Sequence, residues 1–262
     1  MTDTDSIAIR PRRGMVGDAA LLGFWLAVAS LAALTLAPAG WRLGIWHYIV
    51  SFELIRVSAY GGLLAGLVSL ASLCCWARLP RLCRLLAAIG LLLGSVLAYV
   101  PWHYAHIAAR LPLIHDITTD TANPPVFWSV LPARAEEHAV PVEYGGPEVA
   151  RQQLEAYPDI KPVLSDLPPS DAFERALATA QAMPGWIDIV SDKHARRIEA
   201  SQRSFWMGFT DDVVIRVAPH GDGSRIDVRS LSRQGQGDFG VNAARVRAYL
   251  AALKARLALP NG

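Results

Sequence analysis

Uncharged apolar stretches fill the first part of the chain, and mixed polar and apolar sequence follows from about residue 111. The apolar stretches are 19–37, 58–77 and 85–100, and the last has an aromatic extension through Trp102 and Tyr104. A helix needs about 20 residues to cross the ~30 Å hydrocarbon core of a bilayer. The pattern therefore predicts three transmembrane helices within residues 19–104, after an N-terminal tail at 1–18. For the third stretch, a re-entrant or surface helix is the alternative.

Arginine placement predicts how these helices are oriented. Arg10, Arg12 and Arg13 precede the first span, Arg78, Arg81 and Arg84 lie between the second and third, and Arg42 and Arg56 lie between the first and second. By the positive-inside rule, the N-terminal tail and the second loop are cytoplasmic. Three crossings of the inner (cytoplasmic) membrane then place the C-terminal half in the periplasm or another extracytoplasmic space. The cysteines, Cys74, Cys75 and Cys83, all belong to the membrane half, so the outer half can form no internal disulfide.

The spans have small residues and no charged or histidine side chains within them. Transporters usually need ionisable groups in the membrane, so this composition argues against transport. Gly62 and Gly66, like Gly90 and Gly94, are four residues apart, which lets helix backbones approach closely within one molecule or in a homo-oligomer. Chance spacing in a Gly-, Ala- and Leu-rich sequence is the alternative. The segment 41–52, with four aromatic residues and a histidine, is predicted to form a helix that lies along the outer membrane interface.

His103 and His106 share a helix face and could hold a metal ion with His115 as a third ligand. The alternative is an aromatic collar with Trp102 and Tyr104 where the helix leaves the bilayer. We favour the collar because no carboxylate or cysteine accompanies the pair. The sequence therefore predicts no metal site and no cofactor.

The region 105–169 is rich in proline and has little periodicity, yet it has spaced apolar residues. This pattern predicts a segment laid across a folded core, with a short edge strand at 115–120 and a helix from Pro147 to about residue 156. A disordered segment that serves only as a linker is the alternative.

Residues 170–262 are predicted to form that core. A helix capped by Ser170 or Asp171 runs to about Met183, strands follow at 186–191 and 196–202, a hairpin comes next, and a last helix spans 241–257. Within these elements, alternation places Ile187 with Ile189 on one face and Arg197 and Glu199 outward, and it leaves Arg245 mostly off the buried stripe of the last helix. The order of elements predicts an α+β fold, in which helices pack on an antiparallel β-meander sheet C-terminal to the three transmembrane helices.

The hairpin at 211–233 can be placed in register from its residues. A four-residue loop at 220–223 sets Val217 opposite Ile226, Ile215 opposite Val228 and Val213 opposite Ser230. One face is then apolar. The other pairs Arg216 with Asp227 and aligns Arg225, Arg229 and Arg233, whereas a five-residue loop would mix the two faces.

The arginines near the end of this hairpin give a candidate binding surface. Its members are Arg229, Ser230, Ser232, Arg233, Asp238 and Asn242. Paired arginine N–H donors could hold a carboxylate or phosphate there. The alternative is a closed arginine–aspartate network that only pins the loop, with Asp238 capping the last helix or pairing with an arginine. A net charge of +2 is too small to indicate nucleic-acid binding, and no sequence motif of a known catalytic site occurs.

Three motifs resemble a known family. They are Ile-His-Asp-Ile-Thr-Thr-Asp with Asn-Pro-Pro-Val-Phe at 114–127, Tyr-Pro-Asp-Ile at 157–160, and the long run from Asp-Val-Arg-Ser-Leu-Ser-Arg to Ala-Arg-Val-Arg at 227–247. Over residues 113–253 the chain resembles a family of membrane-anchored bacterial proteins, with relatives in photosynthetic lineages, that is known only as a domain of unknown function. Leu231 stands where that family often has another arginine. The resemblance implies no established activity.

Two functional hypotheses of different classes follow. In the first, the protein is an envelope module, anchored in the lipid bilayer, whose outer domain binds a partner protein or an anionic envelope component. The charged face of the sheet, taken to be open, motivates it. In the second, it is an extracytoplasmic, hydrolase-like enzyme with His115, Asp116, Asp238 and Arg229 in one cleft. We favour the module.

Overall fold

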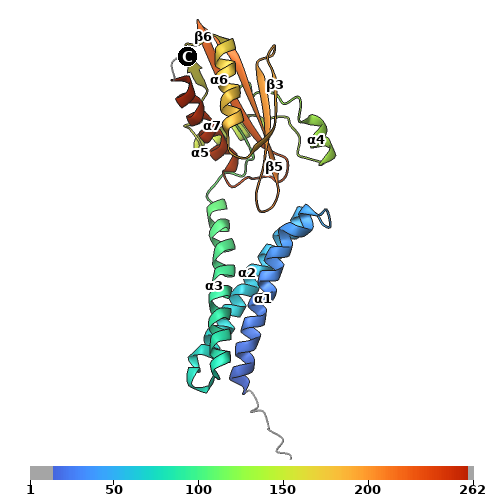
Figure 1. The fold of residues 1–262 in the computed structure, drawn as a ribbon, viewed down its shortest axis with the longest axis vertical. Coiled ribbons are helices and arrows are strands. Elements are labelled where there is room, and N and C mark those ends of the chain that lie inside the picture. The colour runs from blue at the N-terminus through green and yellow to red at the C-terminus, as the bar shows by residue number, and fades with distance from the viewer. Residues whose placement is uncertain (1–13, 259–262) are drawn as a thin grey trace, which may run out of the picture. The chain divides into compact units, whose positions relative to one another are not determined.

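The computed structural model describes residues 14–258 and divides the chain into two compact units, Met1–His106 and Ile107–Gly262 (Figure 1). Arg10, Arg12 and Arg13, on which the predicted topology partly rests, lie outside the described residues. We describe each unit by itself.

Three long helices form the first unit: α1 (Met15–Arg42), α2 (Tyr48–Cys74) and α3 (Arg81–Ala108), with a single 3-10 turn, η1 (Trp76–Arg78), before α3. Each is long and apolar enough to cross a membrane. The third span reaches that length by including its flanks, as predicted. The separate interfacial helix predicted at 41–52 is wrong, because α1 continues to Arg42 and α2 already begins at Tyr48.

Glycines bring α2 and α3 into close contact within this chain. A Cβ atom built on Gly94 would lie 2.5 Å from the Gly62 carbonyl oxygen and 2.7 Å from the Gly66 nitrogen. Only a residue without a side chain fits there, so the predicted close approach of helix backbones within one molecule is present. Assembly of several copies through these glycines stays a prediction.

The two histidines near the end of α3 lie against aromatic rings. His103 stacks on Tyr99 at 5.6 Å between ring centroids, and His106 stacks on Trp102 at 5.7 Å. These contacts fit the aromatic collar. Among residues 14–258, no group of three or more His, Cys, Asp or Glu side chains is arranged to hold a metal ion.

The second unit is an α+β domain with an antiparallel six-stranded sheet, as predicted. Its strands are β1 (Asp116–Thr118), β2 (Val163–Ser165), β3 (Trp186–Asp192), β4 (Arg197–Arg203), β5 (Thr210–His220) and β6 (Gly223–Ser232); its helices are α4 (Leu131–Glu136), α5 (Gly146–Ala156), α6 (Pro169–Ala182) and α7 (Val241–Leu257). The strand order is β1-β6-β5-β4-β3, and β2 pairs with β6 beside β1.

The hairpin of β5 and β6 has the predicted register, with Val217 opposite Ile226, Ile215 opposite Val228 and Arg216 opposite Asp227. Its loop is shorter than predicted, because His220 and Gly223 also pair. The turn is Gly221 and Asp222, and Gly221 has a φ of +57°. Shortening a loop by one residue at each end leaves the register of the strands unchanged, so the alternation of side chains selected the right pairing.

Helices α6 and α7 pack on the apolar face of the sheet (Figure 1). Under them lie the aliphatic side chains of the central strands, with Phe173 of α6 and Val246 and Leu253 of α7. Tyr249 stacks on Trp186 and donates its hydroxyl to the carbonyl of Ala176 at 3.0 Å. Helix α6 begins after Pro168 with no side-chain cap, so the predicted cap at Ser170 or Asp171 is wrong: both residues lie inside its first turn.

The opposite face of the sheet is also covered, contrary to the expected open surface. Phe127 and Val130 of the proline-rich segment pack there on Val214 and Leu231, and Trp128, Val140 and Val142 surround them. This segment also supplies β1, β2, α4 and α5, and its residues Ile117, Tyr157 and Ile160 enter the main core. The charged residues of this face are therefore enclosed.

Strand β3 departs from simple alternation. The pairing with β4 shifts between Ile187 and Val190, and Asp188 in between has a φ of +52°. The extra residue of this bulge turns Ile189 toward the core together with Trp186, and it leaves Ile187 exposed. The predicted pairing of Ile187 with Ile189 on one face is therefore wrong.

Candidate functional site

The six residues of the predicted binding surface come together at the end of β6 and the start of α7. Alternation along β6 sends Arg229 and Arg233 to the enclosed charged face and Ser230 and Ser232 toward α7. All of them are buried except Asp238, which is partly buried. Their side chains belong to three sets of hydrogen bonds and ion pairs.

Arg229 makes a bidentate ion pair with Asp116 of β1. Its Nε donates to Oδ1 at 2.8 Å and its Nη2 to Oδ2 at 2.7 Å. The remaining donors reach the carbonyls of Pro125 at 3.1 Å and Val142 at 2.6 Å, and the guanidinium lies over the Phe127 ring. The guanidinium is thus surrounded by residues of the proline-rich segment 105–169, which covers this face of the sheet and is called the covering segment below.

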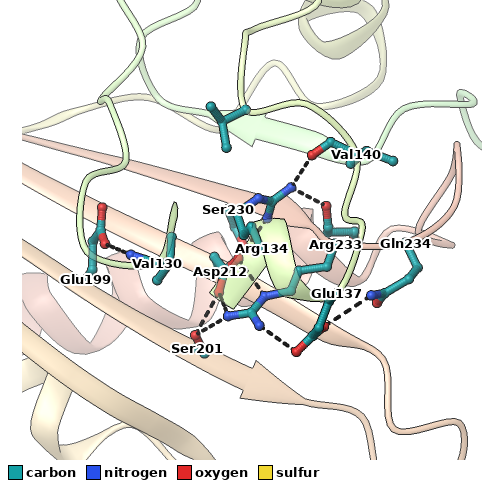
Figure 2. A network of polar contacts seen from close by, with 12 residues as sticks. Val130, Arg134, Glu137, Val140, Glu199, Ser201, Asp212, Ser230, Arg233 and Gln234 are labelled. Atoms are coloured by element: carbon teal, nitrogen blue, oxygen red, sulfur yellow. Dashed lines mark hydrogen bonds and ion pairs between the residues drawn. The ribbon is translucent and has the colours of Figure 1, made fainter. Parts of the chain in front are cut away.

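Asp212 of β5 is the centre of the second set (Figure 2). This fully buried carboxylate accepts hydrogen bonds from Arg134 Nη1 at 2.7 Å, from Arg233 Nε at 2.9 Å and Nη2 at 2.8 Å, and from the Ser201 hydroxyl at 2.7 Å. Arg233 also donates to Glu137 at 2.7 Å. Two arginines therefore face two acids, and only Glu137 of the four is substantially exposed.

The third set lies under the start of α7. The Ser230 hydroxyl donates to Asn242 Oδ1 at 2.6 Å, and Asn242 Nδ2 donates to Ser232 at 2.8 Å and to the His115 carbonyl at 2.9 Å. Arg245 donates to Asn242 and to Asp211 at 2.7 Å. Arg245 is therefore buried against the sheet, and its predicted place off the buried stripe is wrong.

Asp238 caps α7. Its two carboxylate oxygens accept hydrogen bonds from the backbone N–H groups of Gly240 at 2.9 Å and Asn242 at 2.6 Å. Burial raises the pKa of this carboxyl above its usual value, against the effect of those two bonds. Of the two predicted uses of Asp238, the helix cap is present, and the arginines pair with other acids.

Of the four residues of the enzyme hypothesis, only Asp116 and Arg229 are hydrogen-bonded to each other among the described residues. Asp116 is held by Arg229 on the enclosed face. His115, one residue earlier, has its Nδ1 2.7 Å from the Gly235 carbonyl, which fixes Nδ1 as the donor, and it lies near Asp238. Burial lowers the pKa of His115 below its usual value, opposed by the charges of Asp116 and Asp238. Within residues 14–258, the side chains of His115 and Asp238 bond to backbone groups and not to the Arg229–Asp116 pair.

Glu199 of β4, predicted to point into solvent, is fully buried. Its carboxylate accepts the backbone N–H groups of Trp128, Ser129 and Val130, at 2.5, 2.8 and 3.0 Å, and the Ser129 hydroxyl at 2.5 Å. These four hydrogen bonds stabilise the buried Glu199 carboxylate and hold the covering segment to the sheet.

Near the hairpin turn, Asp227 pairs with Arg216 as predicted, at 3.0 Å, and also with Arg225 at 3.0 Å. Asp120 of the covering segment contacts both arginines.

Sequence reasoning missed several members of these sets. They are Arg134, Asp211, Asp212 and the buried roles of Glu199 and Arg245. One signal was present: in the predicted register, the acids that open β5 lie opposite Leu231 and Ser232, beside the arginines of β6. The arrangement as a whole neutralises buried charge within the protein and fixes the covering segment to the sheet.

Comparisons with known proteins place the chain in a family but give it no activity. None of the curated proteins matches. Among solved structures, the crystal structure of Ara h 8.0201 is similar at 14% identity, covering 37% of this chain and 92% of that chain, with a TM-score of 0.28. That score is too low to support an inference about the fold. A family model described as "Protein of unknown function (DUF1499)" matches residues 116–253, which is more than half of the chain. This stretch includes β1, the enclosed charged face and nearly all of α7, and the chain therefore belongs to the DUF1499 family.

Proposed function

We propose that this protein is an envelope module that α1, α2 and α3 anchor in the inner membrane, and whose Ile107–Gly262 domain lies outside the cytoplasm and binds a partner. The candidate partners are a protein and an anionic envelope component. The unequal distribution of arginines around the three apolar helices supports the orientation.

The contacts of the charged face favour a protein partner over an anionic ligand. An anion bound by Arg229 or Arg233 would have to displace Asp116 or Asp212, both of which are buried and well placed. The same contacts count against the hydrolase, because acid–base chemistry needs groups that can reach a substrate. Here those groups hold the protein together.

Strand β3 is the observation that carries the proposal of a protein partner. It ends the strand order and pairs only with β4 among the described strands. Ile187 and Val190 lie opposite Ser201 and Glu199, so both project on the same face, and they are 43% and 44% exposed. Exposed apolar side chains on an edge strand favour association, and natural proteins usually avoid them there. The bulge limits regular strand pairing, so a partner would pack mainly on these two side chains.

Site-specific photo-crosslinking in the full-length protein tests this proposal. A photoreactive amino acid in place of Ser191, an exposed residue of β3, should give a discrete adduct with another protein in cells. The same amino acid in place of Glu155, an exposed residue of α5, is the matched control. We expect the adduct at 191 to disappear when Ile187 and Val190 are both changed to lysine. Equal adducts at 191 and 155, or an adduct at 191 that persists in the lysine variant, would refute β3 as the binding surface.

A further inference from the structure

Five of the exposed apolar side chains of the Ile107–Gly262 unit lie in three short segments. Phe205, which is 95% exposed, and Trp206 lie in the loop between β4 and β5. Phe239 lies in the loop between β6 and α7, and Val241 is the first residue of α7. Leu113 precedes β1. Single exposed apolar residues are ordinary on a protein surface. A group that includes two phenylalanines and a tryptophan needs an explanation.

The strand pairing puts these segments at one end of the sheet. Arg203, at the end of β4, pairs with Thr210, at the start of β5. Asp211 pairs with Ser232, at the end of β6, and Leu231 pairs with Asp116, at the start of β1. The 204–209 loop, the 233–240 loop and the segment leading into β1 therefore all leave the sheet from the same end.

This is also the end at which the chain arrives from α3. Helix α3 ends at Ala108, and the next turn continues it, with the Leu111 N–H donating to the Ala108 carbonyl at 3.1 Å. The Leu111 side chain already lies against the 233–240 loop, 3.4 Å from where a Cβ of Gly240 would be. Only residues 109 and 110 separate α3 from this docked position, a reach of at most roughly 10 Å.

The end of α3 lies close to the membrane surface if α3 spans the bilayer. Counted from the predicted exit near Tyr104, its last residues extend about 6 Å along the helix axis. The exposed aromatic residues Tyr99 and Trp102 are of the kind found at membrane interfaces. The sheet end that carries the apolar group is thus tethered within reach of the lipid headgroups.

The ends of the 204–209 loop are hydrogen-bonded to each other. Ser204 N–H donates to the Phe209 carbonyl at 2.8 Å, and Phe209 N–H donates to the Ser204 hydroxyl at 2.9 Å. Met207 is buried and fixes the loop to the domain, while Phe205 and Trp206 point outward. Arg203, at its base, is exposed and has the charge that attracts anionic lipid headgroups.

We propose that this end of the domain inserts Phe205, Trp206 and Phe239 into the headgroup interface of the bilayer that the helices span. The short tether favours the bilayer as the occupant, because the chain that leaves α3 enters the sheet at this same end. Tryptophan and phenylalanine beside arginine are the residues that interfacial anchors use. The proposal does not depend on which side of the membrane the domain occupies, or on a partner at β3.

Spin-label accessibility in the full-length protein in lipid nanodiscs tests this insertion. The native cysteines, Cys74, Cys75 and Cys83, are first replaced by alanine, and a spin label is attached at Phe205→Cys or Phe239→Cys. Leu164→Cys is the matched control: Leu164 is also apolar and 60% exposed, but β2 pairs it with Arg225 near the opposite end of the sheet. Collisions of each label with oxygen, which partitions into lipid, and with a water-soluble nickel complex are measured.

We expect the ratio of oxygen to nickel collisions to be several-fold higher at 205 and 239 than at 164. Labels at 205 and 239 that collide with nickel as often as the label at 164 would overturn the proposal, because the loops would then lie in water. Low collision rates with both reagents would overturn it too, because another protein surface would then cover the loops. Each labelled variant should melt at the temperature of the unlabelled cysteine-free protein, which separates insertion from misfolding.

Discussion

Single residues on the enclosed sheet face are stabilised by partners that match them closely in geometry and charge. Arg229 with Asp116 and Arg233 with Asp212 are buried ion pairs whose other polar groups also find acceptors or donors. Desolvating two charges offsets much of their attraction, so such a pair adds little net stability compared with an apolar pair. Losing one member is costly, because the other charge then stays buried alone.

Replacing Arg229 by glutamine should therefore destabilise the domain strongly. Asp116 would lose its cation, and we expect a loss of about 3–5 kcal/mol in the free energy of unfolding. Denaturant unfolding of the full-length protein in detergent measures it. Arg247→Gln is the control, because Arg247 and Asp159 form an exposed pair that contributes less than about 1 kcal/mol. Unchanged stability together with the loss of an anionic ligand would instead make Arg229 a binding residue.

His115 should make stability depend on pH. Burial lowers its pKa below 6.5, so the unfolded chain binds the proton more tightly than the folded protein does. Stability should then fall as the pH drops below 6.5 toward the folded pKa, and the effect should be absent above 6.5. The pKa of Asp238 is raised above its ordinary value of 3.8, so this group acts with the opposite sign. It increases stability as the pH falls through its folded pKa toward 3.8.

The variant His115→Asn keeps an amide donor for the Gly235 carbonyl and removes the titration. Its melting temperature should fall less than that of the parent protein between about pH 7.5 and about pH 5.5. Parallel pH profiles for the two proteins would mean that His115 titrates alike in the folded and unfolded states.

At the scale of elements, the proline-rich segment is part of the folded domain. β1 and β2 pair with β6, Tyr157 and Ile160 enter the main core, and Glu199 holds the backbone of Trp128 to Val130. Apolar surface buried in this way contributes about 25 cal/mol per Å², so several such side chains sum to a large share of the stability of a domain.

A chain that begins at Ser170 should therefore lose cooperative unfolding, whereas one that begins at Pro112 should keep it. The shorter chain would expose the edge of β6 and both core faces to water. Denaturation followed by tryptophan fluorescence distinguishes the two chains. Equal midpoints would show that the segment is only a linker.

Alternation of polar and apolar residues predicted the hairpin register, because a slip by one residue would have moved Ile215 and Val217 out of the core. The same pattern predicted α7 over 241–257. Alternation shows which residues share a face, but it does not show whether that face is covered. The cover is a segment with little periodicity, so the burial of Glu199, Arg229 and Arg233 could not be predicted. The bulge at Asp188 was also hidden, because one inserted residue leaves the composition of a strand unchanged.

In the whole molecule, three helices able to cross a membrane precede, in the chain, a domain whose charged groups are largely satisfied internally. What it can bind depends on the compartment it occupies. The proposed function therefore depends on the orientation in the membrane, which is predicted from the arginines in the tail and in the loop between α2 and α3.

Fusing reporters after Gly262 tests that orientation most directly. A reporter enzyme that is active only outside the cytoplasm should be active there, and a fluorescent protein that folds only in the cytoplasm should be dark. The same reporters inserted after Leu79, in the loop between α2 and α3, should give the reverse pattern and serve as the internal control. An inactive exported reporter with a bright cytoplasmic one after Gly262 would contradict the orientation, and with it the proposed envelope function.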